Sequence, residues 1–289
     1  MAREVLCFGE VLWDVYPDKR YIGGAPFNFA AHLAKHNEHV HLLSAVGEDA
    51  LGTETLACLK ERGVDAEYTA VLPQLPTGQS IVTLDEHGVP RYNLIPDVAY
   101  DRIPCEAVPD ACDVLYFGIF ALRSAANFEA LKQLVPTHHF KEIFVDINIR
   151  PPYYSEESVR FAAEHATMIK ISDEELPIAA NLLAIRETEP RAFAERLSAA
   201  YPNLRCILIT CGADGAYAFD CINKKEAYCE SVKAPVQSTV GAGDSFSAAF
   251  LHRYGTDDLG QALRYAVQVS GFVVTQIEAI PDYNPADFA

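Results

Sequence analysis

Short, continuous apolar runs alternate with amphipathic segments along almost the whole chain. The runs are Val5–Gly9, Val40–Val46, Val114–Phe117, Ile143–Ile147, Met168–Ile171 and Cys206–Thr210. A strand that is apolar at nearly every position is buried on both faces, which is typical of a parallel sheet covered by helices. The segments between the runs place apolar residues at helical spacing. The alternation therefore predicts an α/β fold with a doubly wound, mostly parallel sheet.

Two regions depart from this alternation. Gln79–Leu84 and Val89–Ile95 have the pattern of two strands around a turn, and so do Trp13–Tyr16 and Arg20–Gly23. Neither pair has a helical segment between its strands. We expect residues of about 13–23 and 77–97 to form a small β-sheet inserted in a single domain that spans residues 1–289. An antiparallel extension of the main sheet is the alternative explanation.

The composition excludes several classes of protein. The 289 residues include 23 basic and 40 acidic side chains, so the formal net charge of −17 disfavours nucleic acid and anionic membranes as partners. No apolar run has the length needed to span a bilayer. The eight cysteines contain no Cys-x-x-Cys pair, and the nine histidines show no metal-ligand spacing. Because the first residues enter a strand directly, we expect no signal peptide and a cytoplasmic protein with reduced thiols.

A small-residue loop runs into a predicted helix near the C-terminus, in the stretch Thr239-Val240-Gly241-Ala242-Gly243-Asp244-Ser245-Phe246. The free N–H groups at such a helix start attract anions. An acid at the same place repels an anion, and a general base beside a phosphoryl group is one reason for Asp244 to be there. The alternative is an ordinary acid that complements the helix dipole.

Polar residues follow most of the predicted strands, and in open α/β sheets ligands bind beyond the carboxyl ends of the strands. Asp146, Asn148 and Arg150 follow the fourth run and would share one side if the chain stayed extended. Arginine suits phosphate or several sugar oxygens, although a structural Asp–Arg pair is the alternative. Ser172 and Glu175 follow the fifth run with the spacing of a capping box. The stretch Thr210-Cys211-Gly212-Ala213-Asp214-Gly215 follows the sixth and also fits a tight turn between strands.

The C-terminal octet resembles the signature of the ribokinase-like (PfkB) carbohydrate kinases, whose usual form is Asp-Thr-x-Gly-Ala-Gly-Asp. The stretch Gly23-Gly24-Ala25-Pro26-Phe27-Asn28-Phe29-Ala30 resembles a second signature of that family near the N-terminus. The order and spacing of the motifs agree over nearly the whole chain. Three further segments are most similar to fructokinases: Gly9–Asp14, Asp146–Arg150 and Ser172–Glu175.

The resemblance implies an enzyme that transfers the γ-phosphoryl group of ATP to a primary hydroxyl of a small sugar, with fructose as the expected acceptor. It implies a lid role for the small sheet. It also assigns roles to individual residues: Asp244 is the general base, and Gly241, Ala242 and Gly243 form an anion hole; Asp14, Gly24, Asn28, Asn148 and Arg150 bind the sugar; Thr210, Gly212 and Gly215 contact nucleotide phosphates; Glu175 helps to hold Mg²⁺.

The chain departs from the family pattern at Ser238, where the usual residue is an aspartate that helps to bind a monovalent cation. The resemblance therefore leaves a K⁺ requirement open. Ribose, 2-keto-3-deoxygluconate and a nucleoside are the alternative acceptors; Trp13, Phe27 and Phe120 are candidates for an aromatic wall beside a nucleoside. A non-catalytic sugar- or nucleotide-binding relative is the alternative of another class. Exposed edges on the small sheet also make a homodimer an expectation.

Overall fold

The apolar runs form the centre of a nine-stranded sheet in the computed structural model, which describes residues 2–84, 90–109 and 111–288. The strand order is β13-β12-β11-β10-β9-β8-β1-β4-β5. Seven of these strands run parallel to their neighbours, and β12 and β13 are antiparallel. The strands are β1 (Glu4–Phe8), β4 (His39–Gly47), β5 (Thr69–Leu72), β8 (Val114–Gly118), β9 (Glu142–Asp146), β10 (Met168–Ser172), β11 (Cys206–Thr210), β12 (Ala216–Asp220) and β13 (Lys225–Cys229).

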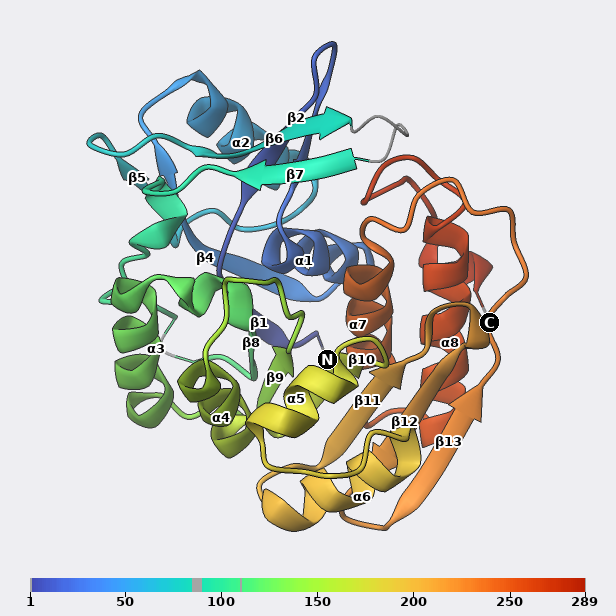
Figure 1. The fold of residues 1–289 in the computed structure, drawn as a ribbon. Helices are drawn as coiled ribbons and strands as arrows, with labels where there is room; N and C mark the ends of the chain where they lie inside the picture. Colours follow the sequence, from blue (N-terminus) through green and yellow to red (C-terminus); the bar gives the residue numbers. More distant parts are fainter. Residues whose placement is uncertain (1, 85–89, 110, 289) are drawn as a thin grey trace.

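Helices cover both faces of this sheet (Figure 1). One apolar core contains residues of α3 (Ala125–Thr137), α4 (Glu156–His165), α5 (Leu176–Leu182) and α6 (Pro190–Ala200). A second core contains residues of α1 (Ala25–Lys35), α2 (Ala50–Glu61), α7 (Ala242–Arg253) and α8 (Leu259–Val273). Alternate residues of β1 enter the two cores, with Phe8 in the first and Cys7 in the second. The doubly wound prediction is therefore confirmed.

The remaining strands form a separate four-stranded sheet, seen at the top of Figure 1. Its order is β3-β2-β6-β7, built from β2 (Leu12–Val15), β3 (Arg20–Gly23), β6 (Gly78–Leu84) and β7 (Pro90–Leu94). The sheet is not an extension of the main one, because the two strand orders share no strand among the described residues. Within it, β2 and β6 pair in parallel with each other. The predicted turn at 85–88 lies outside the described residues. Trp13 donates a hydrogen bond from Nε1 to Thr55 Oγ1 of α2 and so ties the small sheet to a helix.

Some local predictions were incomplete. The segment after the Met168–Ile171 run was expected to be helical, but its helix α5 begins only at Leu176, because Ser172 still belongs to β10 and a turn intervenes. The edge strand β5 was not predicted, since it has four residues and no clear apolar run. All eight cysteines are free thiols in this structure. In the described part of the chain, every helix is too short or too polar to cross a bilayer.

Candidate active site

Asp244 lies in the first turn of α7 and is almost fully buried. Asn28 Nδ2 of α1 donates a hydrogen bond of 2.8 Å to Asp244 Oδ2. Burial raises the pKa of the Asp244 carboxyl group above its usual range, while the Asn28 amide and the cations Lys170 and Arg150 oppose that rise. The structure therefore joins the two sequence motifs at one carboxylate. A buried carboxylate held by one amide is suited to accept a proton.

The backbone conformation at the start of α7 requires glycine. Gly241 caps the helix in the left-handed region, with φ of 79°. A Cβ atom there would lie 2.4 Å from the carbonyl oxygen of Ala279. The first N–H groups of a helix have no acceptor within it. The Ala242 N–H donates a long hydrogen bond of 3.3 Å to the Thr239 carbonyl oxygen just before the helix. This segment, the glycine loop (Gly241–Gly243), has the geometry of an anion site.

Lys170 is a site residue that sequence reasoning missed. It is the one buried lysine in the described part of the chain, and its Nζ contacts Asp146 Oδ1 at 3.1 Å and Oδ2 at 3.2 Å. A Cβ atom on Gly243 would lie 3.1 Å from the same Nζ. Burial raises the pKa of Asp146 to about 6, although Lys170 opposes that rise. The available signal was a lysine in the middle of an apolar strand, where charged residues are rare.

The prediction for Asp146, Asn148 and Arg150 was wrong in its geometry. The extended chain ends at Asp146, and Asn148 adopts a φ of 37°. The three side chains therefore do not alternate along one side. Asp146 pairs with Lys170 and Arg150 is exposed, so the alternative of a structural Asp–Arg pair is wrong and an Asp–Lys pair stands in its place. Arg150 still lies near enough to Asp244 to lower its pKa by charge.

Glu175 connects two loops at the carboxyl ends of β9 and β10. Its Oε1 accepts a hydrogen bond of 2.6 Å from the Ile149 N–H, and its Oε2 accepts one of 2.8 Å from the Ser172 N–H. The second bond is one half of the capping box expected from the sequence. Each oxygen keeps one lone pair, so an outer contact to a metal-bound water is compatible with this geometry.

The sugar-side candidates lie between the small sheet and α1. Asp14 on β2 lies against Gly23, where a Cβ atom would be 3.5 Å from Asp14 Oδ2. Burial raises the pKa of the Asp14 carboxyl group to about 6. Gly24 has φ of 108°, and a Cβ atom there would lie 2.5 Å from the Glu10 carbonyl oxygen. Gly24 therefore has to be glycine to let α1 begin at this point, four residues before Asn28.

Buried polar atoms without partners gather near Asp244. Asn28 Oδ1, Glu10 Oε2 and the Tyr116 hydroxyl have no hydrogen-bond partner among the described residues. Glu10 Oε1 accepts a hydrogen bond of 3.2 Å from the Ala25 N–H at the start of α1. Burial raises the pKa of Glu10 to about 7, and the charge of Asp244 contributes to the rise. Such atoms need a hydrogen-bonding ligand or water.

The predicted nucleotide turn joins β11 to β12, as the alternative reading of the sequence also expected. Gly212 has φ of 50°, and a Cβ atom there would meet nothing within 4 Å, so the turn is open on that side. Gly215 is different, because a Cβ atom there would lie 2.0 Å from the Cys229 carbonyl oxygen of β13. The close approach of β13 therefore explains why the residue at Gly215 has no side chain. Thr210, the last residue of β11, is partly exposed beside the turn.

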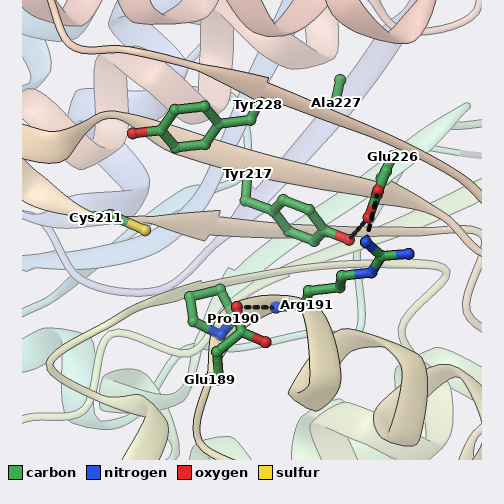
Figure 2. Close-up of a pocket in the computed structure, with 8 residues that line it drawn as sticks. All are labelled: Glu189, Pro190, Arg191, Cys211, Tyr217, Glu226, Ala227 and Tyr228. Carbon is green, nitrogen blue, oxygen red and sulfur yellow. Dashed lines mark hydrogen bonds and ion pairs between the residues drawn. The ribbon is translucent and has the colours of Figure 1, made fainter.

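A cavity of about 380 Å³ lies close to this turn (Figure 2). Its lining residues are Glu189, Pro190, Arg191, Cys211, Tyr217, Glu226, Ala227 and Tyr228. The Tyr217 hydroxyl donates to Glu226, which also pairs with Arg191. Tyr217 belongs to the core on the α6 side of the sheet, whereas α7 covers the other side. The cavity is therefore separate from the site around Asp244.

The side chains fit a magnesium ion that is shared with phosphate groups. Within residues 2–84, 90–109 and 111–288, no three His, Cys, Asp or Glu side chains are grouped to hold a metal ion. Mg²⁺ is usually bound by one or two carboxylates together with substrate phosphates and water. A single carboxylate such as Glu175 is consistent with that mode.

Comparison with known proteins agrees with this geometry. The model of the pfkB family carbohydrate kinases matches residues 3–287. A fructokinase from Rhizobium leguminosarum bv. trifolii is 26% identical over 274 residues, which cover 88% of this chain and 81% of that protein. A fructokinase from Xylella fastidiosa, solved with bound ATP, has a TM-score of 0.83 at 22% identity, covering 96% of this chain and 93% of that chain.

A fructokinase double mutant from Vibrio cholerae O395, solved with fructose, ADP and a potassium ion, has a TM-score of 0.81 at 21% identity. The match covers 97% of this chain and 96% of that chain. These solved structures confirm the ribokinase-like fold, with its large, mostly parallel sheet and its smaller separate sheet. The family match over residues 3–287 agrees with the two motifs that meet at Asp244. The chain therefore belongs to the pfkB family of carbohydrate kinases and is an ATP-dependent sugar kinase, as its sequence predicted.

Proposed function

We propose that this kinase phosphorylates fructose at a primary hydroxyl, with Asp244 as the general base. The observation that carries the proposal is the 2.8 Å hydrogen bond between Asn28 and Asp244, which joins the two signature motifs in one buried place. The curated relatives that match most of this chain include the fructokinase of Rhizobium leguminosarum bv. trifolii. At 26% identity this relative supports the choice of sugar, and direct assay has to test it.

Asp244 would take the proton of the attacking hydroxyl as its oxygen approaches the phosphoryl group. Because the Asp244 carboxylate is buried, water is kept away from it and the sugar hydroxyl is the group that can donate a proton to it. The N–H groups of the glycine loop (Gly241–Gly243) would stabilise the negative charge that develops on the transferring group. Since both elements belong to the first turn of α7, the base and the anion site keep a fixed relation to each other.

Asp14, Gly24 and Asn28 would bind the sugar. Asn28 donates one amide hydrogen to Asp244, and its buried Oδ1 has no partner among the described residues, so it can accept from a sugar hydroxyl. Asp14 would accept from a second hydroxyl. Asn148 and Arg150 follow β9 and would complete this side. Because Asp14 belongs to the small sheet, closure of that sheet as a lid would bring an acceptor to the sugar and exclude water.

Thr210 and Gly212 would contact the nucleotide phosphates, and Gly215 would shape their turn. Three exposed apolar side chains lie on the segments before α7 and after α8: Val236, Val240 and Ile277. Such a surface suits the base of the nucleotide. Bound Mg²⁺ would neutralise charge on the phosphate oxygens, with Glu175 orienting its water ligands.

A potassium requirement stays open for this chain. Ser238 has a hydroxyl group, rather than a carboxylate, at the position implied for cation binding, and its Oγ accepts a hydrogen bond of 3.2 Å from the Val240 N–H. The proposal also includes a cytoplasmic location and a homodimer. Trp13 and Phe27 do not form an aromatic wall for a nucleoside, because both rings are buried and the Trp13 ring donates a hydrogen bond to Thr55.

The test is ADP release from Mg-ATP with fructose, ribose, glucose, 2-keto-3-deoxygluconate and adenosine as acceptors. A clear rate with fructose alone is the expected result. Turnover with another acceptor would keep the mechanism and change the sugar. If no acceptor supports ADP release, a non-catalytic sugar- or nucleotide-binding protein becomes the better description, which ATP binding without turnover would support.

A further inference from the structure

The buried ammonium group of Lys170 is not used by the mechanism above. Lys170 is the third residue of β10, flanked by apolar neighbours, and its side chain is 8% exposed. It pairs in register with Asp146 on the neighbouring strand β9, so both side chains point to the same face of the sheet. That face is the one covered by α7, because the ammonium group lies 3.1 Å from the place of a Cβ atom on Gly243.

The position of this cation is unfavourable for the helix. The N-terminus of an α-helix carries a partial positive charge, so a cation beside the first turn is repelled. A contribution to the stability of the fold does not explain the Lys170–Asp146 ion pair either, since a protein with an apolar pair of similar volume in a buried place is often as stable. A bound anion at the glycine loop (Gly241–Gly243), in contrast, would be attracted by the helix end and by Lys170 together.

The charged groups around Lys170 come from several elements. Three carboxylates attract its ammonium group: Asp146 at the end of β9, Glu175 at the start of α5 and Asp244 of α7. Asp244 also interacts by charge with the buried Glu10 and with a second cation, the exposed Arg150. The Tyr116 hydroxyl of β8 is neutral, since burial raises its pKa. Lys170 is therefore the buried positive charge in a group of carboxylates.

We propose that Lys170 is a positioning residue of the transfer site: Asp146 fixes its ammonium group beneath the glycine loop, where it keeps Asp244 ionised and attracts the transferring phosphoryl group. The first effect acts on the general base, and the second acts on the charge that the glycine loop binds. The inference rests on the proposed function for its second effect. The first effect concerns two residues of the free protein and is measurable without any substrate.

Three variants separate charge from structure. Lys170→Met removes the ammonium group but leaves Asp146 buried and unpaired, which is destabilising. The double variant Lys170→Met/Asp146→Asn removes both charges and so relieves that penalty. Asp146→Asn alone keeps the ammonium group and removes its anchor. Thermal unfolding of each variant establishes which ones are folded. If Lys170→Met does not fold, the measurements are made on the double variant.

The first measurement is the pKa of Asp244 in the free protein, followed by NMR of ¹³C-labelled aspartate carboxyl groups and assigned with Asp244→Asn. Loss of a nearby opposite charge raises the pKa of a carboxyl group. The double variant and Asp146→Asn both lack the charge of Asp146 and differ only in the ammonium group of Lys170, so we expect a higher pKa of Asp244 in the double variant than in Asp146→Asn. Equal pKa values of Asp244 in these two variants would overturn the proposal.

The second measurement is the pH profile of kcat/KM with the accepted sugar. We expect the double variant to lose on the order of 100-fold at neutral pH, comparable to the loss of one anion-hole donor, with its acidic limb moved to higher pH. Asp146→Asn should stay within about tenfold, by the same comparison. A folded double variant with wild-type rates would mean that the pair is structural only. If the wild type phosphorylates no acceptor, the proposed function fails, and the NMR result still decides the effect of Lys170 on Asp244.

Discussion

Two residues that are 216 positions apart in the sequence, Asn28 and Asp244, form the centre of the site. If Asp244 is the base, Asp244→Asn should lower turnover by about a hundred- to ten-thousand-fold, the usual cost of losing a general base. The affinity for ATP should stay within a few-fold, because the glycine loop is unchanged. ADP release and calorimetric titration with ATP measure the two effects. Turnover within a few-fold of the wild type would exclude Asp244 as the base.

The amide of Asn28 should affect how Asp244 ionises. Asn28→Leu removes a hydrogen bond to the charged form of the carboxylate, so the pKa of Asp244 should rise further. The acidic limb of the kcat/KM profile should then move to higher pH. Asn127→Leu is the matched control, since Asn127 is also buried but bonds the carbonyl oxygens of Tyr100 and Ala121. The control should lower the melting temperature and leave the limb in place.

Asp14 should make sugar binding depend on pH. Burial raises its pKa to about 6, so the carboxylate is ionised above that pH and becomes neutral below it. An ionised carboxylate accepts hydrogen bonds from sugar hydroxyls with both oxygens, so KM for the sugar should rise as pH falls through about 6. Asp14→Asn should raise KM at neutral pH and remove this dependence. A KM that follows pH equally in the variant would contradict the assignment.

Local motifs in the sequence predicted some residues of the candidate site. Residues whose place depends on the pairing of strands could not be predicted in this way. Asn28 and Asp244 were predicted because each belongs to a local pattern. Lys170 was missed because its partner Asp146 is on another strand, and the register that brings them together is set by the whole sheet. The turn at Asn148 was missed because the strand pattern was extended past Asp146, although asparagine adopts a positive φ several-fold more often than most residues.

At the scale of single elements, the start of α7 depends on backbone contacts that a side chain would break. Gly241→Ala should lower the melting temperature by several degrees, since its Cβ would collide with the Ala279 carbonyl and left-handed backbone costs about 1–2 kcal/mol for a residue other than glycine. Gly212→Ala is the matched control, with a left-handed φ but open space around its Cβ. Circular dichroism melts should show a clearly smaller loss in the control. Equal losses of melting temperature in the two variants would mean that the left-handed backbone alone, and not the contact with Ala279, makes glycine necessary at Gly241.

The elements were predicted unevenly for a physical reason. Central strands such as β1 and β11 are apolar at almost every position, so their sequence identifies them. The edge strands β5 and β13 are short and partly exposed, and their pattern resembles that of a loop. The separate small sheet was predicted because each of its two strand pairs, β2 with β3 and β6 with β7, has no helix between its two strands. Its motion as a lid remains a prediction.

At the scale of the whole molecule, the small sheet leaves β3 and β7 as edge strands. Unpaired edges are places where two chains can associate, and a homodimer would cover them. Light scattering coupled to size exclusion should then give twice the chain mass of 31.8 kDa. A mass equal to that of one chain, unchanged as the protein concentration rises, would reject the homodimer. Because the charge of −17 disfavours close approach, the measurement belongs at physiological salt.

The distance in sequence between Asn28 and Asp244 also matters while the protein is being made. Synthesis proceeds from the N-terminus, and domains begin to fold as they emerge from the ribosome. Asn28 is translated early, whereas Asp244 follows 216 residues later, on the order of ten seconds or more at the usual rate of synthesis. A nascent or truncated chain consequently holds no assembled base and anion site. Premature termination should yield fragments that do not consume ATP.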